Sequence, residues 1–481
     1  MANTKRGLFV KSDVDAAFGV FFDGFTKVIA GVGIMIGSIG LSSEIVFGTI
    51  LPGLGLGVLI LHLFTWWYGN VTAKRTNNPG IVAMPAGITA GRFFVWLSAI
   101  MLPTYMATGD AGLALGVGLA ANIVSSLFTV ILAFVGPYIL KVLPSPALFG
   151  SLAGGGITWL ILASFNDMFV SPIIAVVCFF IIIIMYVTKM KCKFSPVMIS
   201  IVVGVIIGFL TGDIATAQIV ESVGNVGFSV PLPAFEYLIG GFGEVIKFIP
   251  IIIAFSLAEM VSALQGIEQA RVTGDEYDGK VALIGVSLAS AVSALFGNPF
   301  CFSLWWGYGT WKEIKASTGY SLLVGIAYFV LCSTGLVAIV TTVIPTAAVL
   351  PILVFVGMCS FGGAFINEKS KYFGIMAIAA AIPIIEYIGN LAGANMPASL
   401  MVLAKGAPLI ALAWGSILVY AADLRFRAAS IAAFVAAGMS FVGLIHASGL
   451  GINASPEMTI AYGIVAVVLL VLSFMKVEVE A

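Results

Sequence analysis

Two hydrophobic stretches of this chain are interrupted by proline and glycine in a way that a continuous helix does not tolerate. The first reads Asn-Pro-Gly-Ile-Val-Ala-Met-Pro-Ala-Gly over residues 78–87, and the second reads Gly-Asn-Pro-Phe-Cys-Phe-Ser over residues 297–303. Proline lacks a backbone donor and glycine loosens a helix, so such backbone can lie at membrane depth only where it is buried or lines a cavity. One such break in each half of a membrane chain indicates a transporter substrate site near the bilayer midplane.

The composition places the chain in a membrane. Hydrophobic residues make up 60% of it, charged residues 9%, and the mean hydropathy is +1.14, far from the balance of soluble domains. Lys and Arg together number 22, as do Asp and Glu, which argues against binding to nucleic acid. The five cysteines form no CxxC pair and lie mostly in apolar runs, so we expect neither disulfides nor metal ligands.

Sixteen segments are apolar enough to be membrane spans. They lie near residues 16–40, 46–69, 81–105, 112–135, 145–165, 169–188, 195–212, 247–268, 280–297, 298–312, 318–342, 345–362, 372–389, 400–421, 427–447 and 458–475. Almost all lysines and arginines fall in alternate loops and near the two ends of the chain. Because cytoplasmic loops carry the excess of these residues, we expect a multi-pass protein of the plasma (inner) membrane with both termini cytoplasmic.

The longest polar, turn-rich interval divides the chain into two halves. We expect a first seven-span repeat over residues 1–212, an extracellular or periplasmic linker over 213–240, a second seven-span repeat over 241–421, and two additional spans over 422–481. Because seven is odd, the second repeat must be inverted relative to the first. The similar stretches 143–148 and 344–349 open the fifth span of each half, and the two interrupted stretches open the third.

Short motifs in several spans carry a family resemblance. Residues 78–85 with the later pair Phe93-Phe94, and residues 255–261 with their single acidic residue, are the clearest of them. Further similar stretches lie at 296–297, 318–319, 344–348, 355–357 and 382–389. Together they resemble the xanthine/uracil permeases of the nucleobase/ascorbate transporter superfamily, and most of all the AzgA-like hypoxanthine/guanine permease branch. The resemblance covers about residues 16–421 and leaves out the last two spans.

The resemblance implies an all-α fold of 14 spans, built as two inverted seven-span repeats and divided into a core domain and a gate domain. In that fold spans 3 and 10 begin as short extended segments that cross, and the substrate lies between them and span 8. The gate domain commonly forms a homodimer. The resemblance also implies secondary active import of a small planar solute, a purine-type nucleobase, by proton or other cation symport with an elevator-like or rocking motion of the core.

Glu259 is the strongest candidate for a functional side chain. It lies between the apolar stretches 251–255 and 261–264, and a carboxylate in hydrocarbon is costly enough to mark a substrate or proton path. Burial disfavours its charged form, so the residue is suited to exchanging the coupled proton. In the family the matching acid contacts ring nitrogens of the substrate. The alternative is a protonated glutamate that only hydrogen-bonds a neighbouring helix.

The interrupted stretches are expected to form the other walls of the substrate site. Their free N–H and C=O groups, and the positive ends of the helices that follow, would face the point where they cross. With Phe255 from span 8, we expect the substrate to contact Met84, Pro85, Ala86, Gly87, Phe302, Ser303, Leu304, Trp305 and Trp306. The aromatic side chains would stack on a flat ring, although tryptophan also anchors helices at membrane surfaces.

Two features depart from the family pattern. Uracil-type relatives carry an acidic residue at the start of the tenth-span helix, where this chain reads Leu-Trp-Trp-Gly over 304–307. Arg92, just behind the first break, has no counterpart in the family motif. It could pair with Glu259, face an anionic substrate, or lie against helix-end carbonyls. Both departures suit the alternative function, a small organic or inorganic anion transporter of the related sulfate-permease-like fold.

The sequence carries no enzyme motif. It has no HExxH, no GxSxG, no GxxxxGK followed by Ser or Thr, and no His/Asp/Glu cluster with metal spacing. We therefore expect no catalytic residues, metal or cofactor, and transport that does not use ATP. The expected partners are a small-molecule substrate, a coupling cation, the lipid bilayer and a second copy of the chain.

Overall fold

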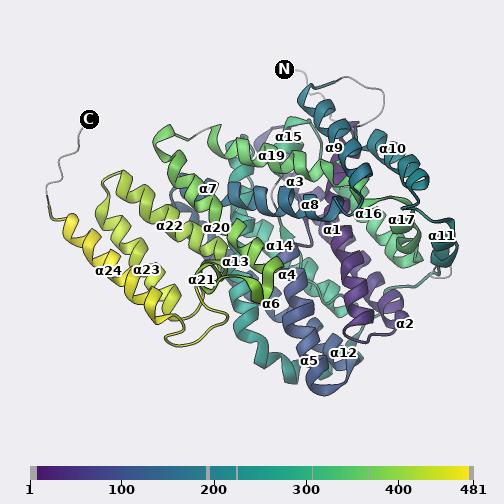
Figure 1. Cartoon of the computed structure of the whole chain (residues 1–481), viewed down its shortest axis with the longest axis horizontal. Helices are drawn as coiled ribbons and strands as arrows, with labels where there is room; N and C mark the ends of the chain where they lie inside the picture. Colours follow the sequence, from purple (N-terminus) through teal and green to yellow (C-terminus); the bar gives the residue numbers. More distant parts are fainter. Residues whose placement is uncertain (1–7, 191–195, 224–225, 306, 367, 476–481) are drawn as a thin grey trace.

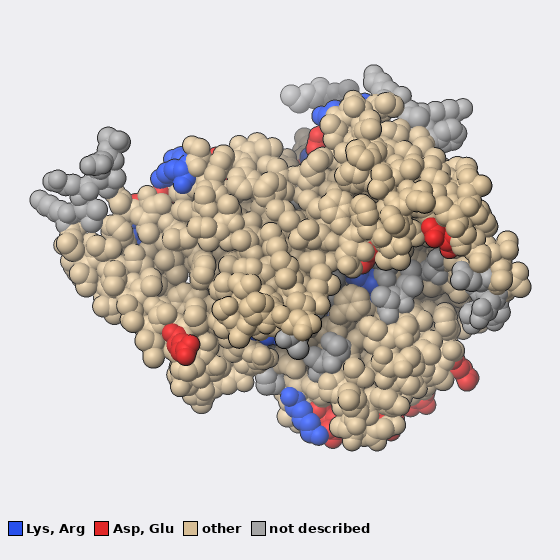
Figure 2. Space-filling model, viewed as in Figure 1, with Lys and Arg blue, Asp and Glu red and all other residues tan. Residues whose placement is uncertain are grey.

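The computed structural model describes residues 8–190, 196–223, 226–305, 307–366 and 368–475, and these are almost entirely helical (Figure 1). Within this part of the chain, six helices are long and apolar enough to cross a membrane, or seven if one bent pair counts as a single span. The space-filling view shows few charged side chains on a broad uncharged surface (Figure 2). The expected all-α membrane fold is therefore confirmed.

The first half contains α1 (Ser12–Gly37), α2 (Ser43–Ile45), α3 (Leu51–Thr76), β1 (Ala86–Gly87), α4 (Ala90–Val95), α5 (Leu102–Thr108), α6 (Ala111–Val142), α7 (Ser145–Gly155), α8 (Ala163–Met168), α9 (Pro172–Val187), α10 (Pro196–Thr211) and α11 (Thr216–Val223). The π-helical stretches η1 (Val46–Ile50), η2 (Trp96–Met101) and η3 (Gly156–Leu162) join neighbouring helices into longer rods.

The second half contains α12 (Phe235–Glu244), η4 (Val245–Phe248), α13 (Ile249–Val272), α14 (Gly279–Leu295), β2 (Ser303–Leu304), α15 (Tyr308–Glu313), α16 (Gly319–Thr334), α17 (Val337–Val343), α18 (Thr346–Val349), α19 (Pro351–Ile366), η5 (Ser370–Tyr372), α20 (Phe373–Ala392), η6 (Gly393–Asn395), α21 (Ala398–Ala404), α22 (Ala407–Ala422), α23 (Phe426–Phe441) and α24 (Pro456–Leu472). Proline stands in the first turn of α9, α13, α22 and α24, where its missing N–H costs no helical hydrogen bond.

The packing of the helices repeats when the two halves are exchanged. Helix α3 packs against α16, and α14, the counterpart of α3, packs against α6, the counterpart of α16. In the same way α1 packs on α16 while α13 packs on α6, and α9 packs on α10 while α20 packs on α22. A pseudo-two-fold relation between two inverted seven-span units produces this exchange of partners, as the fold class requires.

The contacts also divide the helices into two groups, a core and a gate. The core contains α1, α3, α6, α13, α14 and α16 with both strands, and the gate contains α7, α9, α10, α19, α20 and α22. The groups meet where α13 touches α7 and α22, where α1 touches α10 and α18, and where α15 touches α19. Each contact between the core and the gate is less extensive than the main helix contacts within either group.

The interrupted stretches form a pair of short antiparallel strands inside the core. In strands β1 and β2, Ala86 is paired with Leu304 and Gly87 with Ser303. The backbone N–H of Trp305 donates to the carbonyl of Pro85 at 3.1 Å, which extends the pairing by one bond. The expectation that spans 3 and 10 begin as extended segments that meet is confirmed.

Two expected continuous spans are broken instead. The helix pair α21 and α22, expected as one span over 400–421, bends by 84° between Ala404 and Ala407. Gly406 at the bend has a φ of +81°, and the following Pro408 begins a new helix. The span expected over 318–342 is broken in the same way at Gly335, with a φ of +67°. The expected linker also contains α11 and the start of α12.

The two additional helices at the carboxyl end pack on each other and on α22, and they lie together at one end of the molecule (Figure 1). The loop between them carries His446, which is buried. Its backbone N–H donates to the carbonyl of Lys405 at 2.8 Å, and its ring contacts the hydroxyl of Tyr462 at 2.8 Å. This loop therefore braces the bend between α21 and α22.

Gly53 provides a test of the core packing. A Cβ at this position in α3 would lie 2.0 Å from the carbonyl oxygen of Phe296, directly before the second interrupted stretch. A methyl group at this distance would overlap the backbone, and backbone can shift only at a cost in free energy. Gly53→Ala is therefore expected to lower the free energy of unfolding by about 1–3 kcal/mol. The measurement is the thermal unfolding midpoint of the purified protein in detergent. The matched control is Gly33→Ala in α1, where nothing lies within 4 Å; equal midpoints for the two variants would contradict the close approach.

Candidate functional site

Glu259 is joined to the first interrupted stretch by a threonine that sequence reasoning missed. Thr89 precedes α4 and occupies its N-cap position, but its side chain makes no capping bond there. Instead its hydroxyl donates to Oε1 of Glu259 at 2.6 Å. The other carboxylate oxygen, Oε2, is buried and has no hydrogen-bond partner in the structure. Glu259 thus keeps one oxygen available to accept a hydrogen bond or hold a proton.

Arg92, in the first turn of α4, is buried, and no carboxylate among the described residues pairs with it. Its Nη2 donates to the hydroxyls of Ser125 at 2.5 Å and Ser256 at 3.2 Å. Its Nη1 donates to the carbonyl of Phe302 at 3.5 Å, and the guanidinium lies 5.5 Å from the centre of the Trp96 ring. Nε has no partner, and the side chain is 3% exposed. The suggested ion pair with Glu259 is not formed, while a contact with a backbone carbonyl is.

Arg92 and Glu259 border the same small cavity, which has a volume of about 10 Å³. Its lining comes from α4, β2 and helices α6, α13 and α14, and contains Arg92, Thr129, Glu259, Met260, Leu283, Val286, Ser287, Phe302, Ser303 and Leu304. A space of this size holds about one water molecule. In this conformation the core therefore closes around the two charged side chains.

The other expected site residues lie around the strand pair but do not line this cavity. Met84 and Ala86 are buried, and Trp305 is 6% exposed. Trp305 lies against α13, because a Cβ on Gly266 would come within 3.3 Å of its carbonyl oxygen. Pro85 and Gly87 contribute to the strand pairing, and Phe255 is partly buried on α13. Trp306 lies outside the described residues.

A polar stripe on α6 holds both Arg92 and the second interrupted stretch. Its members are Asn122, Ser125, Ser126 and Thr129. The amide of Asn122 donates to the carbonyls of Asn298 at 3.1 Å and Phe300 at 3.0 Å. Positions three, four and seven residues apart share one helix face. This spacing of polar residues within an apolar span is visible in the sequence and indicates a polar face directed at the protein interior.

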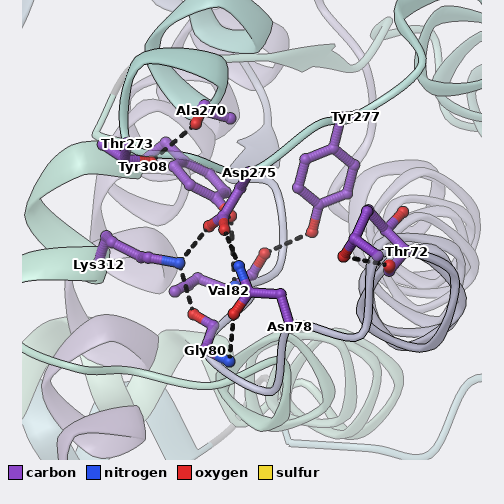
Figure 3. A network of polar contacts seen from close by, with 11 residues as sticks. Thr72, Asn78, Gly80, Val82, Ala270, Thr273, Asp275, Tyr277, Tyr308 and Lys312 are labelled. Atoms are coloured by element: carbon purple, nitrogen blue, oxygen red, sulfur yellow. Dashed lines mark hydrogen bonds and ion pairs between the residues drawn. The ribbon is translucent and has the colours of Figure 1, made fainter.

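A buried aspartate fastens the two interrupted stretches together (Figure 3). Asp275, in the loop after α13, is 0% exposed. It accepts hydrogen bonds from Asn78 Nδ2 at 2.8 Å, the Tyr308 hydroxyl at 2.5 Å and Lys312 Nζ at 2.5 Å. Lys312 Nζ also donates to the carbonyl of Gly80 at 2.7 Å. One carboxylate therefore fixes the start of the first stretch to α15, the helix that follows the second.

Nothing in the sequence alone indicates this role of Asp275. The segment 273–278 reads Thr-Gly-Asp-Glu-Tyr-Asp, which is an ordinary polar loop between two spans. Only the folded chain brings it against residues 78–82, where the hydroxyl of Tyr277 also donates to the carbonyl of Val82. A loop far from the breaks in sequence thus determines where they lie.

Known proteins resemble this chain only distantly. No protein-family model matches it, and neither does any curated protein. Among the solved structures similar to it is the transmembrane domain of a cyanobacterium bicarbonate transporter, BicA, with 16% identity over 78% of this chain and 97% of that one and a TM-score of 0.47. The structure of SLC26A9 has 12% identity over 82% of this chain and 65% of that one, with a TM-score of 0.45. The murine solute carrier 26 family member A9 anion transporter in the inward-facing state has 14% identity over 79% of this chain and 67% of that one, with a TM-score of 0.41. None of these names is that of a nucleobase permease, so the expected AzgA-like branch gains no support. At these scores the likeness says nothing of what this chain carries.

Asp275→Asn tests this role of Asp275. The substitution keeps the size of the side chain but removes the charge opposite Lys312 and places an N–H₂ group among three donors. We expect the free energy of unfolding to fall by about 1–3 kcal/mol, since buried donors lose their acceptor. The measurement is the thermal unfolding midpoint, with the exposed Glu457→Gln as control.

A double variant tests whether Asp275 and Lys312 stabilise the fold through their contact with each other. Asp275→Asn combined with Lys312→Met removes both charges, so its loss should be smaller than the sum of the two single losses. Simple additivity would show that the Asp275 and Lys312 charges do not stabilise each other.

Proposed function

We propose that this chain is a secondary active transporter that carries a small organic or inorganic anion across the membrane through the crossing of β1 and β2. The observation that supports it most directly is the buried guanidinium of Arg92, which has serine hydroxyls and a carbonyl around it but no carboxylate paired with it. Burying an unpaired charge is costly. A bound anion would offset that cost by accepting a charge-assisted hydrogen bond from the free Nε of Arg92.

Glu259 would couple the anion to a proton. Its free Oε2 belongs to a residue that borders the same cavity as Arg92. An ionised carboxylate repels an anion, so anion binding favours the protonated glutamate, and release of the anion favours loss of the proton. The anion and the proton would therefore cross the membrane together.

Transport requires the cavity to open toward each side in turn. The core touches the gate through a small set of helices, so the core can rock or slide against the gate as a unit. We further propose a homodimer in the plasma (inner) membrane, with cytoplasmic termini supported by the lysines and arginines of alternate loops. The four segments 1–212, 213–240, 241–421 and 422–481 remain our proposed division of the chain.

A purine-type nucleobase is the second candidate substrate, and the free Oε2 of Glu259 favours it. A carboxylate oxygen accepts well from a ring N–H, and the Nε of Arg92 could donate to a ring carbonyl. The cavity of about 10 Å³ would have to grow much more for a purine than for a small anion. The anion is the better candidate for that reason.

Arg92→Gln tests the substrate class. The purified protein is reconstituted in liposomes, and uptake of labelled bicarbonate, formate, sulfate and hypoxanthine is measured. Loss of a charge-assisted hydrogen bond should lower the initial rate of anion uptake about tenfold or more, since such bonds contribute about 1.5–3 kcal/mol. Arg271→Gln is the control, because the Arg271 side chain is largely exposed and does not line the cavity. Hypoxanthine uptake that survives in Arg92→Gln, in a protein that takes up no anion, would instead support the nucleobase.

Glu259→Gln tests the proton coupling. Glutamine keeps the shape and the bond from Thr89 but cannot exchange a proton. In liposomes with an inward proton gradient, we expect the variant to lose accumulation of substrate while exchange of internal for external substrate continues. Thermal unfolding close to that of the unsubstituted protein shows that the fold is intact. Accumulation that keeps its dependence on external pH would leave Glu259 a structural residue only.

A further inference from the structure

A groove of about 440 Å³ lies at the end of the molecule formed by the last two helices. It runs between the turn that joins α22 to α23 and the end of α24, and its lining includes Arg425, Arg427, Leu472 and Met475. It is separate from the cavity at the strand pair and contains no residue of that site.

The two arginines of the groove have no counter-charge in the part of the chain that the structure describes. The adjacent carboxylate, Asp423, is already engaged by Lys371 Nζ at 2.6 Å and the Tyr372 hydroxyl at 2.7 Å. Arg425 lies over the Tyr420 ring at 5.0 Å, and Arg427 lies over the Phe474 ring at 5.5 Å. These rings hold the arginines in place without neutralising them.

The surface beside the groove is apolar. Ile431 and Phe434 on α23, Val471 on α24 and Phe474 just beyond it are all exposed. On a membrane protein such side chains face lipid tails. The groove thus combines two cations with an adjoining surface for hydrocarbon, at the point where helices α23 and α24 begin and end.

We propose that this groove binds the phosphate headgroup of an anionic phospholipid, whose acyl chains lie along α23 and α24. The planar fork of each arginine matches two phosphate oxygens. The first turn of α23 has no side-chain cap, so its N–H groups can add to the contact. Basic pockets of this kind between helices at a membrane surface suit acidic headgroups. The site does not depend on which solute the chain transports.

The test uses the full chain, purified in detergent and incorporated into phosphatidylcholine nanodiscs that contain a small share of dioleoylphosphatidylglycerol. Native mass spectrometry counts the lipids that remain bound. We expect phosphatidylglycerol to be retained over phosphatidylcholine, and Arg425→Gln with Arg427→Gln to lower its affinity about tenfold or more. The control Lys74→Gln with Lys315→Gln removes two positive charges elsewhere and should change little. Equal retention by the arginine double variant and the unsubstituted protein would overturn the proposal.

Three further measurements distinguish a lipid headgroup from other occupants of the groove. Arg425→Lys with Arg427→Lys keeps both positive charges but loses the planar guanidinium groups. Its affinity for phosphatidylglycerol should therefore lie between those of the glutamine variant and the unsubstituted protein. The lysine variant also replaces the glutamine variant if the latter fails to fold. Inorganic phosphate at millimolar concentration should not displace the lipid, and displacement would make the groove a free-phosphate site. Truncation after Met475 removes Glu478 and Glu480. If only the truncated protein bound phosphatidylglycerol, the tail and not a lipid would be the occupant.

Discussion

The need to satisfy backbone hydrogen bonds away from water governs the rest of this structure. Two stretches of chain leave the helical conformation inside an apolar interior, and every N–H and C=O freed there requires a partner. The structure supplies partners from several neighbouring elements. The hydroxyl of Tyr320 donates to the carbonyl of Ala83 at 2.8 Å, Ser290 Oγ accepts from the N–H of Phe302 at 2.8 Å, and Asn122 serves two carbonyls. The polar side chains of Asn122, Ser290 and Tyr320 thus serve the backbone of the two interrupted stretches.

Other hydroxyl groups bind the two charged residues of the site, which do not bind each other. Ser125 and Ser256 bind Arg92, and Thr89 binds one oxygen of Glu259. A direct bidentate ion pair would use two N–H donors of Arg92 and both carboxylate oxygens of Glu259. With hydroxyls as partners, Nε of Arg92 and Oε2 of Glu259 both remain without one. An unsatisfied group is costly in a core but useful in a binding site, because a ligand that pairs with it recovers the cost.

The breaks at residues 78–87 and 297–303 could be predicted from sequence because proline and glycine occur there together within apolar runs. The bends at Gly335 and Gly406 could not, since the chain has 55 glycines and the sequence does not show which of them adopt a positive φ. Glu259 was visible as a lone acid in an apolar span. Asp275 was not, because its role arises only when a loop folds against a segment almost 200 residues away.

The carboxyl-terminal helices change how the gate can behave. A helix bent by 84° leaves backbone groups at the bend without helical hydrogen bonds. Without other contacts, the angle between its two parts would change easily. Here the loop after α23 packs against the bend, because a Cβ on Gly406 would lie 2.5 Å from the carbonyl oxygen of Leu444. In the same loop, His446 forms hydrogen bonds with both Lys405 and Tyr462. The bend becomes part of a three-helix unit with α22, α23 and α24. Under the proposed transport mechanism, a gate braced in this way would stay fixed while the core that carries the strand pair moves.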